Sequence, residues 1–215
     1  MDVLLVRAAD VPEYVQDGVV ECGVTGADLV RESGAKVEEL LRLGFGACTL
    51  EAAVPAESSA RSLDDLDGLR VATVYPRLAA ALLRERGVSV DLVSSGSTLR
   101  TNGLRSVEAL FSSEAVLVGG PGGDDRAREL ATVLRSVVEA RETRYLMLNA
   151  PESALEEITK LVPGSAAPSV LPLAVPGMVA IHALVPAADV WRLLPRLEAA
   201  GGSSILLVPI ERMLA

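Results

Sequence analysis

Short apolar runs alternate with segments of helical periodicity through most of the chain, and this alternation is the strongest constraint on its fold. The predicted strands lie at residues 3–6, 19–25, 49–54, 69–73, 88–93 and 115–118. The predicted helices begin near residues 11, 29, 76, 98 and 124, and the second of these is expected to carry Leu40 and Leu41 towards its end. Repeated alternation of strand and helix predicts an α/β fold.

Two stretches suggest how this α/β region divides. Residues 55–68 are rich in Ser, Asp and Glu and are predicted to cross between two lobes, and the Gly-rich stretch 119–123 is predicted to be a flexible joint. We therefore expect a first lobe from residues 1–54 and 119–143, and a second lobe from residues 55–118.

The composition of the chain shifts after the helix predicted to end near Arg141. From there the pattern is strand, helix, strand, strand, helix, strand, at residues 145–148, 152–162, 169–174, 179–185, 189–200 and 205–208. This order predicts a separate ferredoxin-like βαββαβ domain over residues 144–215. The apolar stripes of its two helices would cover one face of the sheet and leave the other face free for a ligand or a partner. Pro195 lies inside the last predicted helix, where it costs about 3 kcal/mol unless the helix bends or ends.

The charge of the chain limits what it binds. With 20 basic and 29 acidic residues the formal net charge is -9, which argues against binding to nucleic acid or to an anionic membrane. Any phosphate must then be held by backbone amides and a few well-placed side chains. The two cysteines, Cys22 and Cys48, lie in stretches that resemble ordered core and suggest neither a disulfide framework nor a metal site. Without a signal-like start or a long apolar run, we expect a cytoplasmic protein.

The stretch from Asp91 to Leu99 is the sharpest candidate site. A predicted strand delivers one carboxylate, and a loop of small residues then leads into a predicted helix: Ser94, Ser95, Gly96, Ser97 and Thr98. Such a loop can surround a phosphate with amides and hydroxyls, while Asp91 accepts hydrogen bonds from ribose. An ordinary Ser/Gly turn with Thr98 as the helix N-cap is an open alternative.

This stretch is similar to the phosphoribosyl-pyrophosphate loop of the ATP phosphoribosyltransferase family. Other matching stretches follow the order of that family: Val6-Arg7 with Asp10-Val11-Pro12 and Tyr14-Val15, Gly23-Val24-Thr25-Gly26 with Asp28, Leu43-Gly44-Phe45-Gly46, and Ala72-Thr73 with Tyr75-Pro76. The segment from Tyr145 to the end resembles the regulatory domain of the long form of the family. The resemblance implies a two-lobed catalytic body like a periplasmic binding protein, followed by the ferredoxin-like regulatory domain.

The resemblance also implies roles for particular residues. It places the phosphoribosyl group at Asp91 and at Ser94, Ser95, Gly96, Ser97 and Thr98, with Asp91 and Arg7 as the catalytic residues. It places ATP at Arg7, Glu21, Asp28, Leu29, Thr73 and Tyr75. It places histidine, as a feedback inhibitor, at Asn149, Ser165, Ala167, Ser169 and Ser204. Without the resemblance, Arg7 is more often a solvated charge at a strand end, Asp28 is usually a helix-start acid, and Tyr75 is equally a packing aromatic.

The family reaction joins N1 of the ATP adenine to the anomeric carbon of phosphoribosyl pyrophosphate and releases pyrophosphate, as the first step of histidine biosynthesis. No protein nucleophile is needed, because catalysis comes from aligning two anionic substrates, with Mg²⁺ on the substrate phosphates. The resemblance also implies a homo-oligomer, from dimer to hexamer. We interpret His182 as a partly buried structural histidine and Trp191 as a packing residue.

The chain departs from the family pattern at two places. The family begins with a strand and a Lys-Gly-Arg stretch that this sequence does not match, and it has a further strand and helix between the positions of Val90 and Asp91. Loss of these segments is expected to lower the rate, since preorganised cationic contacts stabilise the transition state. The alternatives are therefore a catalytically impaired or inactive paralogue that binds histidine, and a two-lobed solute-binding protein.

Overall fold

The computed structural model describes residues 2–88, 91–94, 103–162 and 167–214, and of residues 91–94 it describes the backbone. The chain separates into two compact units, Met1–Ala131 and Thr132–Ala215, and the boundary falls inside helix α4 (Asp125–Glu142). None of the described helices is long and apolar enough to cross a membrane.

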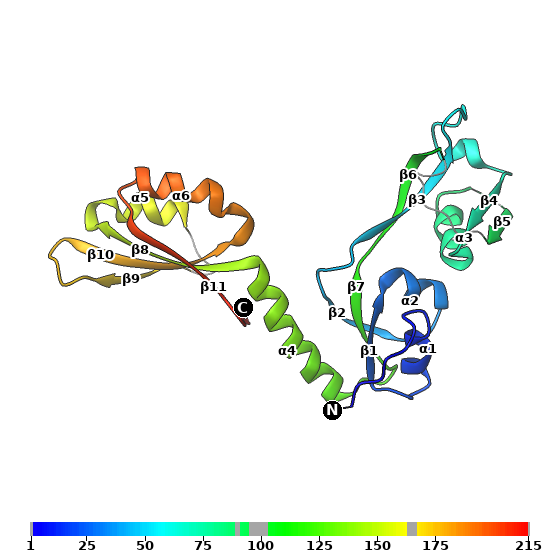
Figure 1. Cartoon of the computed structure of the whole chain (residues 1–215), viewed down its shortest axis with the longest axis horizontal. Helices are drawn as coiled ribbons and strands as arrows, with labels where there is room; N and C mark the ends of the chain where they lie inside the picture. Colours follow the sequence, from blue (N-terminus) through cyan, green and yellow to red (C-terminus); the bar gives the residue numbers. More distant parts are fainter. Residues whose placement is uncertain (1, 89–90, 95–102, 163–166, 215) are drawn as a thin grey trace. The chain divides into compact units, whose positions relative to one another are not determined.

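The first part of unit 1 is a three-stranded antiparallel sheet with the order β1-β7-β2 (Figure 1). Its elements are α1 (Val11–Gln16), β1 (Cys22–Gly26), α2 (Ala27–Ser33), β2 (Glu38–Arg42) and β7 (Ala115–Gly119). Val11 and Val15 of α1 pack with Ala27 of α2 against Val116 and Val118 of β7. Both helices thus join the core of this small sheet.

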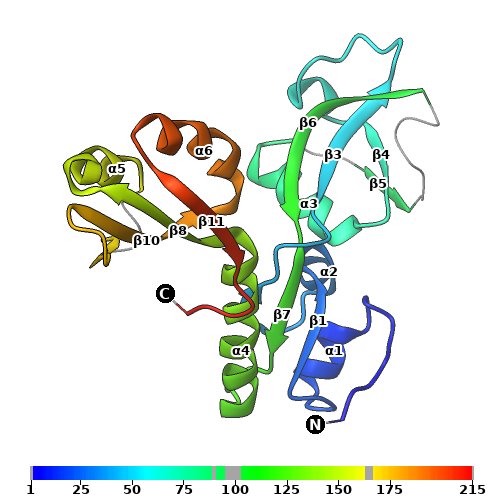
Figure 2. The same cartoon turned by 60° about the vertical axis from the view of Figure 1, so that its left-hand side comes forward.

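The second part of unit 1 holds two further strand pairs around a separate apolar core. Its elements are β3 (Cys48–Pro55), η1 (Asp64–Leu66), β4 (Arg70–Thr73), α3 (Pro76–Glu85), β5 (Asp91–Ser94) and β6 (Leu104–Ser113). β3 pairs antiparallel with β6, and β4 pairs parallel with β5. Leu78, Leu82 and Leu83 of α3 are buried in this core. Only Glu114 separates β6 from β7, so one extended run connects the two parts (Figure 2).

Unit 2 contains a four-stranded antiparallel sheet with the order β11-β8-β10-β9. Its elements are β8 (Thr143–Pro151), η3 (Glu152–Ala154), α5 (Leu155–Leu161), β9 (Ser169–Pro172), β10 (Met178–Pro186), η4 (Ala187–Asp189), α6 (Val190–Ala199) and β11 (Ser203–Pro209). Both helices lie on one face of the sheet (Figure 1), where Leu148, Ile158, Ile181 and Leu197 are fully buried. The predicted ferredoxin-like order is confirmed, and α6 continues through Pro195.

Two element predictions for unit 1 are wrong. Residues 3–6 form no strand, and Leu5 is 92% exposed, because an apolar run becomes a strand only when another strand accepts its backbone hydrogen bonds. The helix after Gly26 does not reach Leu40 and Leu41. Gly34 ends it in the left-handed conformation with a φ of 68°, and both leucines lie in β2.

The helix expected from Thr98 begins outside the described residues, and the strand β6 was not predicted. From Leu104 onward the chain is β6, while residues 95–102 lie outside the described part of the chain. The register of β6 with β3 shifts twice, between Leu50 and Glu51 and between Ala52 and Ala53. Such irregularities break the alternation of apolar and polar residues that identifies a strand in a sequence.

Interpretations of three single residues have different outcomes. Cys48 is exposed rather than part of a core, and Cys22 is partly buried. Trp191 is 85% exposed, so the packing interpretation is wrong within the described part of the chain. His182 is partly buried in β10, and its Nδ1 lies 3.0 Å from the hydroxyl oxygen of Tyr145. The predicted partial burial of His182 is therefore confirmed.

Candidate functional site

The carboxylate of Asp28 is fixed at the point where β1 passes into α2. Ser113 Oγ donates a hydrogen bond of 2.7 Å to Asp28 Oδ1 and accepts one of 3.0 Å from the backbone N of Asp28. The backbone N of Ala27 also donates to the carbonyl of Glu114, at 3.0 Å. The junction of β6 and β7 therefore holds the first turn of α2, where a negative charge is favoured by the helix dipole.

Tyr75 completes this group from the other part of unit 1. Its hydroxyl donates a hydrogen bond to Asp28, and its backbone N donates one of 3.0 Å to Oγ1 of Thr73, which is buried at the end of β4. The hydrogen bond to Asp28, followed by burial and by nearby negative charge, raises the pKa of Tyr75 to about 12. We call Asp28, Tyr75 and Ser113 the carboxylate cluster.

The charge state of the carboxylate cluster follows from the same contacts. Burial alone would raise the pKa of Asp28, but hydrogen bonds from Ser113, Tyr75 and the backbone N–H groups of Asp28 and Leu29 outweigh it and lower the pKa. Near neutral pH, Asp28 is therefore ionised while Tyr75 keeps its proton. The cluster thus presents a charged acceptor that is held in place by donors from the end of β6 and from the turn between β4 and α3.

Helices α2 and α3 are joined by reciprocal capping beside the carboxylate cluster. Glu32 of α2 accepts hydrogen bonds from the backbone N of Arg77, at 3.1 Å, and of Leu78, at 2.8 Å, in the first turn of α3. In return, the guanidinium of Arg77 donates to the carbonyl of Ser33 at the end of α2. Each helix end thus has its free backbone groups satisfied by the other helix.

Sequence reasoning did not identify Ser113, Glu32 or Arg77. The Tyr75-Pro76 start of α3 leaves N–H groups that need an acceptor, so an acidic cap could have been expected there. The cap is supplied by Glu32, more than forty positions away in the chain, and that separation leaves no local signal. Ser113 was missed with β6 itself.

The structure brings together some of the residues predicted for ATP and leaves others apart. Asp28, Thr73 and Tyr75 lie in one connected group, and Leu29 follows Asp28 in α2. Arg7 and Glu21 are exposed. Among the described residues, no hydrogen bond or ion pair links the side chain of either residue to the carboxylate cluster. The segment of Arg7 does approach β1, because Thr25 Oγ1 donates to the carbonyl of Ala8 at 2.6 Å.

The backbone register places the start of the predicted phosphate loop near Tyr75. Asp91 pairs with Arg70, and Ser94 with Thr73, in the parallel pair β4 and β5. Parallel strands end at the same edge of a sheet, so the chain leaves β5 next to the turn that carries Tyr75. The remaining residues of the predicted loop lie outside the described part of the chain: Ser95, Gly96, Ser97 and Thr98.

A cavity of about 550 Å³ opens beside Thr73 and Tyr75. Its walls come mainly from β3, β4, α3 and β6 and are mostly apolar, with Leu83 and Leu110 among them. The volume falls within the range of small-molecule sites. The cavity gives space for an apolar or planar group next to the carboxylate cluster.

The residues predicted to bind histidine lie mainly on the sheet face of unit 2 that the helices leave uncovered. Asn149 of β8 alternates with the buried Leu148 and Ala150, and Ser169 of β9 pairs with His182. Ser204 lies in the bulge of β11 with a φ of 49°, and the neighbouring Ser203 Oγ donates to the carbonyl of Asn149 at 3.2 Å. Ala167 is exposed, and Ser165 lies outside the described residues.

Comparisons with known proteins agree over nearly the whole chain. The family model described as ATP phosphoribosyltransferase matches residues 7–91 and 88–139, and the model described as HisG, C-terminal domain, matches residues 140–212. The ATP phosphoribosyltransferase of Methanococcoides burtonii is 38% identical over 237 residues, covering 98% of this chain and 84% of the relative. That of Gemmatimonas aurantiaca is 40% identical over 248 residues, covering 99% of this chain and 85% of the relative.

A solved structure shares the fold. The ATP phosphoribosyl transferase (HisG:HisZ) complex from Thermotoga maritima superposes with a TM-score of 0.51 and 19% identity, covering 63% of this chain and 78% of that chain. The first family model matches in two segments that meet at residues 88–91. Both relatives align over more positions than the 215 residues of this chain. These observations agree with the segment predicted to be missing between Val90 and Asp91.

Proposed function

Since the chain belongs to the ATP phosphoribosyltransferase family, we propose that its carboxylate cluster binds the adenine nucleotide in the family reaction. That reaction transfers the phosphoribosyl group of phosphoribosyl pyrophosphate to N1 of ATP, giving phosphoribosyl-ATP and pyrophosphate, and it is the first step of histidine biosynthesis. The observation that carries the assignment is the ionised Asp28, held by Ser113 and by Tyr75, and Tyr75 in turn lines a cavity of about 550 Å³.

The chemistry of the carboxylate cluster suits a nucleoside. An ionised carboxylate accepts hydrogen bonds from amino or hydroxyl groups, and the apolar walls of the neighbouring cavity suit a planar base. Tyr75 and Ser113 act on Asp28 as positioning residues, because their hydroxyls donate to it. Leu29 and Thr73 border this group, and we assign Arg7 and Glu21 to the same nucleotide from the family resemblance alone.

We assign the phosphoribosyl side to Asp91 and the loop that follows β5. The parallel register of β4 and β5 supports this, because it brings Ser94 and the turn of Tyr75 to one edge. Ser95, Gly96, Ser97 and Thr98 would then offer amides and hydroxyls to the 5-phosphate. The two substrates would thereby meet at the ends of adjacent strands, which is the alignment that the transfer requires.

Magnesium would enter with phosphoribosyl pyrophosphate. Mg²⁺ prefers phosphate oxygens together with one or two carboxylates. Within the described ranges, no group of three His, Cys, Asp or Glu side chains is arranged to hold a metal ion, so we assign no protein cage to it. When bound, the ion would neutralise charge on the departing pyrophosphate.

The nucleotide assignment is tested with Asp28→Asn, and Asp17→Asn is the matched control on the exposed end of α1. We expect Asp28→Asn to lower kcat/KM for ATP by about 10- to 100-fold, because a hydrogen bond to a charged group contributes about 1.5–3 kcal/mol. Pyrophosphate release with both substrates is the measurement. Equal kcat/KM in Asp28→Asn and Asp17→Asn would remove the carboxylate cluster from the site.

The phosphate loop is tested separately with Gly96→Val. A Cβ branch there should obstruct the tight turn and abolish calorimetric binding of phosphoribosyl pyrophosphate. Unchanged affinity would show that the loop does not surround the phosphate.

We propose that residues 144–215 form a regulatory domain that binds free histidine through Asn149, Ser165, Ala167, Ser169 and Ser204. The uncovered sheet face supports this, because Asn149 and Ser169 both lie on it. Histidine must also change substrate binding or assembly if it is to inhibit. Light scattering and thermal shift during a histidine titration are the measurements, and no response at millimolar histidine would leave only a structural domain.

The same face supports a homo-oligomer, from dimer to hexamer. Leu171, Leu206 and Val208 are 40–56% exposed there, and large exposed apolar patches commonly mark interfaces. Leu206→Glu should lower the mass measured by light scattering, whereas Val19→Glu, at an exposed loop position of unit 1, should not. The same mass for both variants would argue against this interface.

The phosphorylated substrates favour a cytoplasmic location.

We also propose the division into a first lobe of residues 1–54 and 119–143, a second lobe of residues 55–118, and a regulatory domain of residues 144–215. The strand pairing supports moving β3 from the first lobe to the second, because β3 pairs with β6. It also supports keeping β7 in the first lobe, because β7 lies in the sheet of β1 and β2. The lobes would then meet where β2 leads to β3 and where β6 leads to β7.

A further inference from the structure

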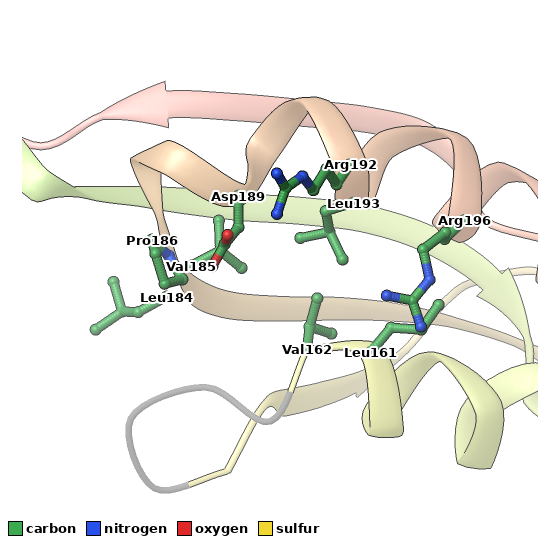
Figure 3. A pocket seen from close by; sticks show the side chains of 9 residues that line it. All are labelled: Leu161, Val162, Leu184, Val185, Pro186, Asp189, Arg192, Leu193 and Arg196. Atoms are coloured by element: carbon green, nitrogen blue, oxygen red, sulfur yellow. The ribbon is translucent and has the colours of Figure 1, made fainter.

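A second cavity, of about 490 Å³, lies in unit 2 on the side of the sheet that carries the helices (Figure 3). It is enclosed by the end of α5, the end of β10 and the first turns of α6. Val162, Val185 and Leu193 form its apolar floor, and all three are buried. None of the residues proposed for the nucleotide, the phosphoribosyl group or histidine lines this cavity.

Two arginines of α6 reach over this apolar floor. Arg192 and Arg196 are four positions apart and therefore share one face of the helix, and Figure 3 shows both side chains on the cavity side, with Val162 opposite them. Both side chains are exposed, and neither guanidinium has a hydrogen bond or an ion pair with any residue that the structure describes. The chain places these two cations together despite its net charge of -9.

The placement of Arg192 and Arg196 on one face of α6 does not stabilise this helix. Like charges four positions apart repel each other, and Pro195 between them removes a backbone hydrogen bond from α6. An anion bound between the two guanidiniums would relieve the repulsion. Asp189 lines the same cavity and offers a hydrogen-bond acceptor, so the lining carries two positive charges and one negative charge.

We propose that this cavity is a binding site for a small organic anion with an apolar body. Guanidinium groups bind carboxylate and phosphate oxygens through paired hydrogen bonds, which suits Arg192 and Arg196 to the anionic end. The floor of Val162, Val185 and Leu193 takes the hydrocarbon or aromatic part. The volume lies within the range of sites for molecules of this size. This site is separate from the proposed histidine site, since the two share no residue.

The test is isothermal titration calorimetry on the full chain with a matched set of probes. Phenylacetate and phenyl phosphate supply the two kinds of anionic group, and 2-phenylethanol is the uncharged analogue. Acetate and inorganic phosphate supply the charge without the apolar body. We expect phenylacetate or phenyl phosphate to bind with a stoichiometry of one per chain, and the tighter of the two identifies the anionic group.

The variant that decides the matter is the double substitution Arg192→Gln with Arg196→Gln, and Arg212→Gln is the exposed control outside the cavity. We expect the affinity of the preferred probe to fall at least tenfold in the double variant, with the melting temperature preserved, and to stay unchanged in Arg212→Gln. Equal affinity in the double variant, absence of binding by both aromatic anions, or equally tight binding of acetate or inorganic phosphate would overturn the proposal.

Discussion

At the scale of single residues, the hydrogen bond from Tyr75 to Asp28 has a signature in the titration of the tyrosines. It raises the pKa of Tyr75 to about 12, above the ordinary value near 10. The sign follows from linkage: a folded pKa above the unfolded one means stability that is complete below about pH 10 and lost as the pH rises through about 12. Tyr75 thus reports on the integrity of the carboxylate cluster.

We predict that one of the three tyrosines ionises near pH 12 in the absorbance of the folded protein. Tyr75→Phe should remove this late transition, and Asp28→Asn should move it down towards pH 10, because the acceptor loses its charge. Tyr14→Phe is the control and should leave the late transition in place. A late transition that survives Tyr75→Phe would contradict the assignment.

Residues of the candidate site could be predicted only where they lie in a short, continuous stretch of sequence with a recognisable pattern. Asp28 and Tyr75 lie in short stretches that match the family, Gly23-Val24-Thr25-Gly26 with Asp28 and Ala72-Thr73 with Tyr75-Pro76, and the resemblance alone assigned both to the nucleotide. Ser113 pairs with Asp28 across 85 positions of the chain, a separation that local periodicity does not encode. Ser113 could therefore be identified as the hydrogen-bond partner of Asp28 only from the structure.

At the scale of elements, the reciprocal capping of α2 and α3 sets the distance between Asp28 and Tyr75. Glu32 takes two backbone hydrogen bonds at the start of α3, and an N-terminal cap contributes about 0.5–2 kcal/mol. We predict that Glu32→Ala lowers the free energy of unfolding by about 1 kcal/mol. Glu32→Ala should also raise KM for ATP. Tyr75 directly precedes α3, so loosening the start of this helix should displace the Tyr75 hydroxyl that positions Asp28.

Urea denaturation and steady-state kinetics measure these two effects, with Glu57→Ala as the control at an exposed position that caps no helix. A loss of stability with unchanged KM would show that the capping supports the fold but not the site. Equal stability of Glu32→Ala and Glu57→Ala would contradict the capping role.

Pro195 gives a prediction of the opposite sign. It lies inside α6 and is exposed, so Pro195→Ala restores a backbone N–H without opening a cavity. We predict a gain of about 1–3 kcal/mol in the free energy of unfolding, measured in urea, because proline costs about 3 kcal/mol in a helix interior. Pro209→Ala, at the end of β11, is the control and should change stability little. A loss of stability in Pro195→Ala would mean that α6 depends on its proline.

The elements divide into those with clear local signals and those set by distant pairing. All the strands and helices of unit 2 follow the predicted order, and β8 carries the clearest local signal, because its residues from Leu146 to Pro151 alternate between buried and partly buried. In unit 1, β2 and β6 were missed. β2 pairs with a register shift between Glu39 and Leu41, and β6 pairs with β3 through two register shifts. These shifts interrupt the regular alternation of apolar and polar residues by which a strand is recognised in a sequence.

At the scale of the whole molecule, unit 2 has a core of its own. Leu146, Ile158, Ile181 and Leu197 are fully buried within it, and the backbone N of Met213 donates to the carbonyl of Ser136 in α4. We predict that a fragment of residues 132–215 folds alone and unfolds cooperatively, as followed by circular dichroism. A shorter fragment of residues 144–215 loses the contact of Met213 and should be less stable. A non-cooperative transition in the longer fragment would contradict an independent unit.

If the uncovered face of the sheet in unit 2 joins two copies of the chain, the results of solution measurements depend on the protein concentration used. The proposed pairing of two copies through Leu171, Leu206 and Val208 would be bimolecular, so mass action would make the apparent melting temperature rise with protein concentration. Assays at nanomolar enzyme and calorimetry at micromolar enzyme would then sample different assembly states. Activity per chain would depend on enzyme concentration, and Leu206→Glu would make both quantities independent of it.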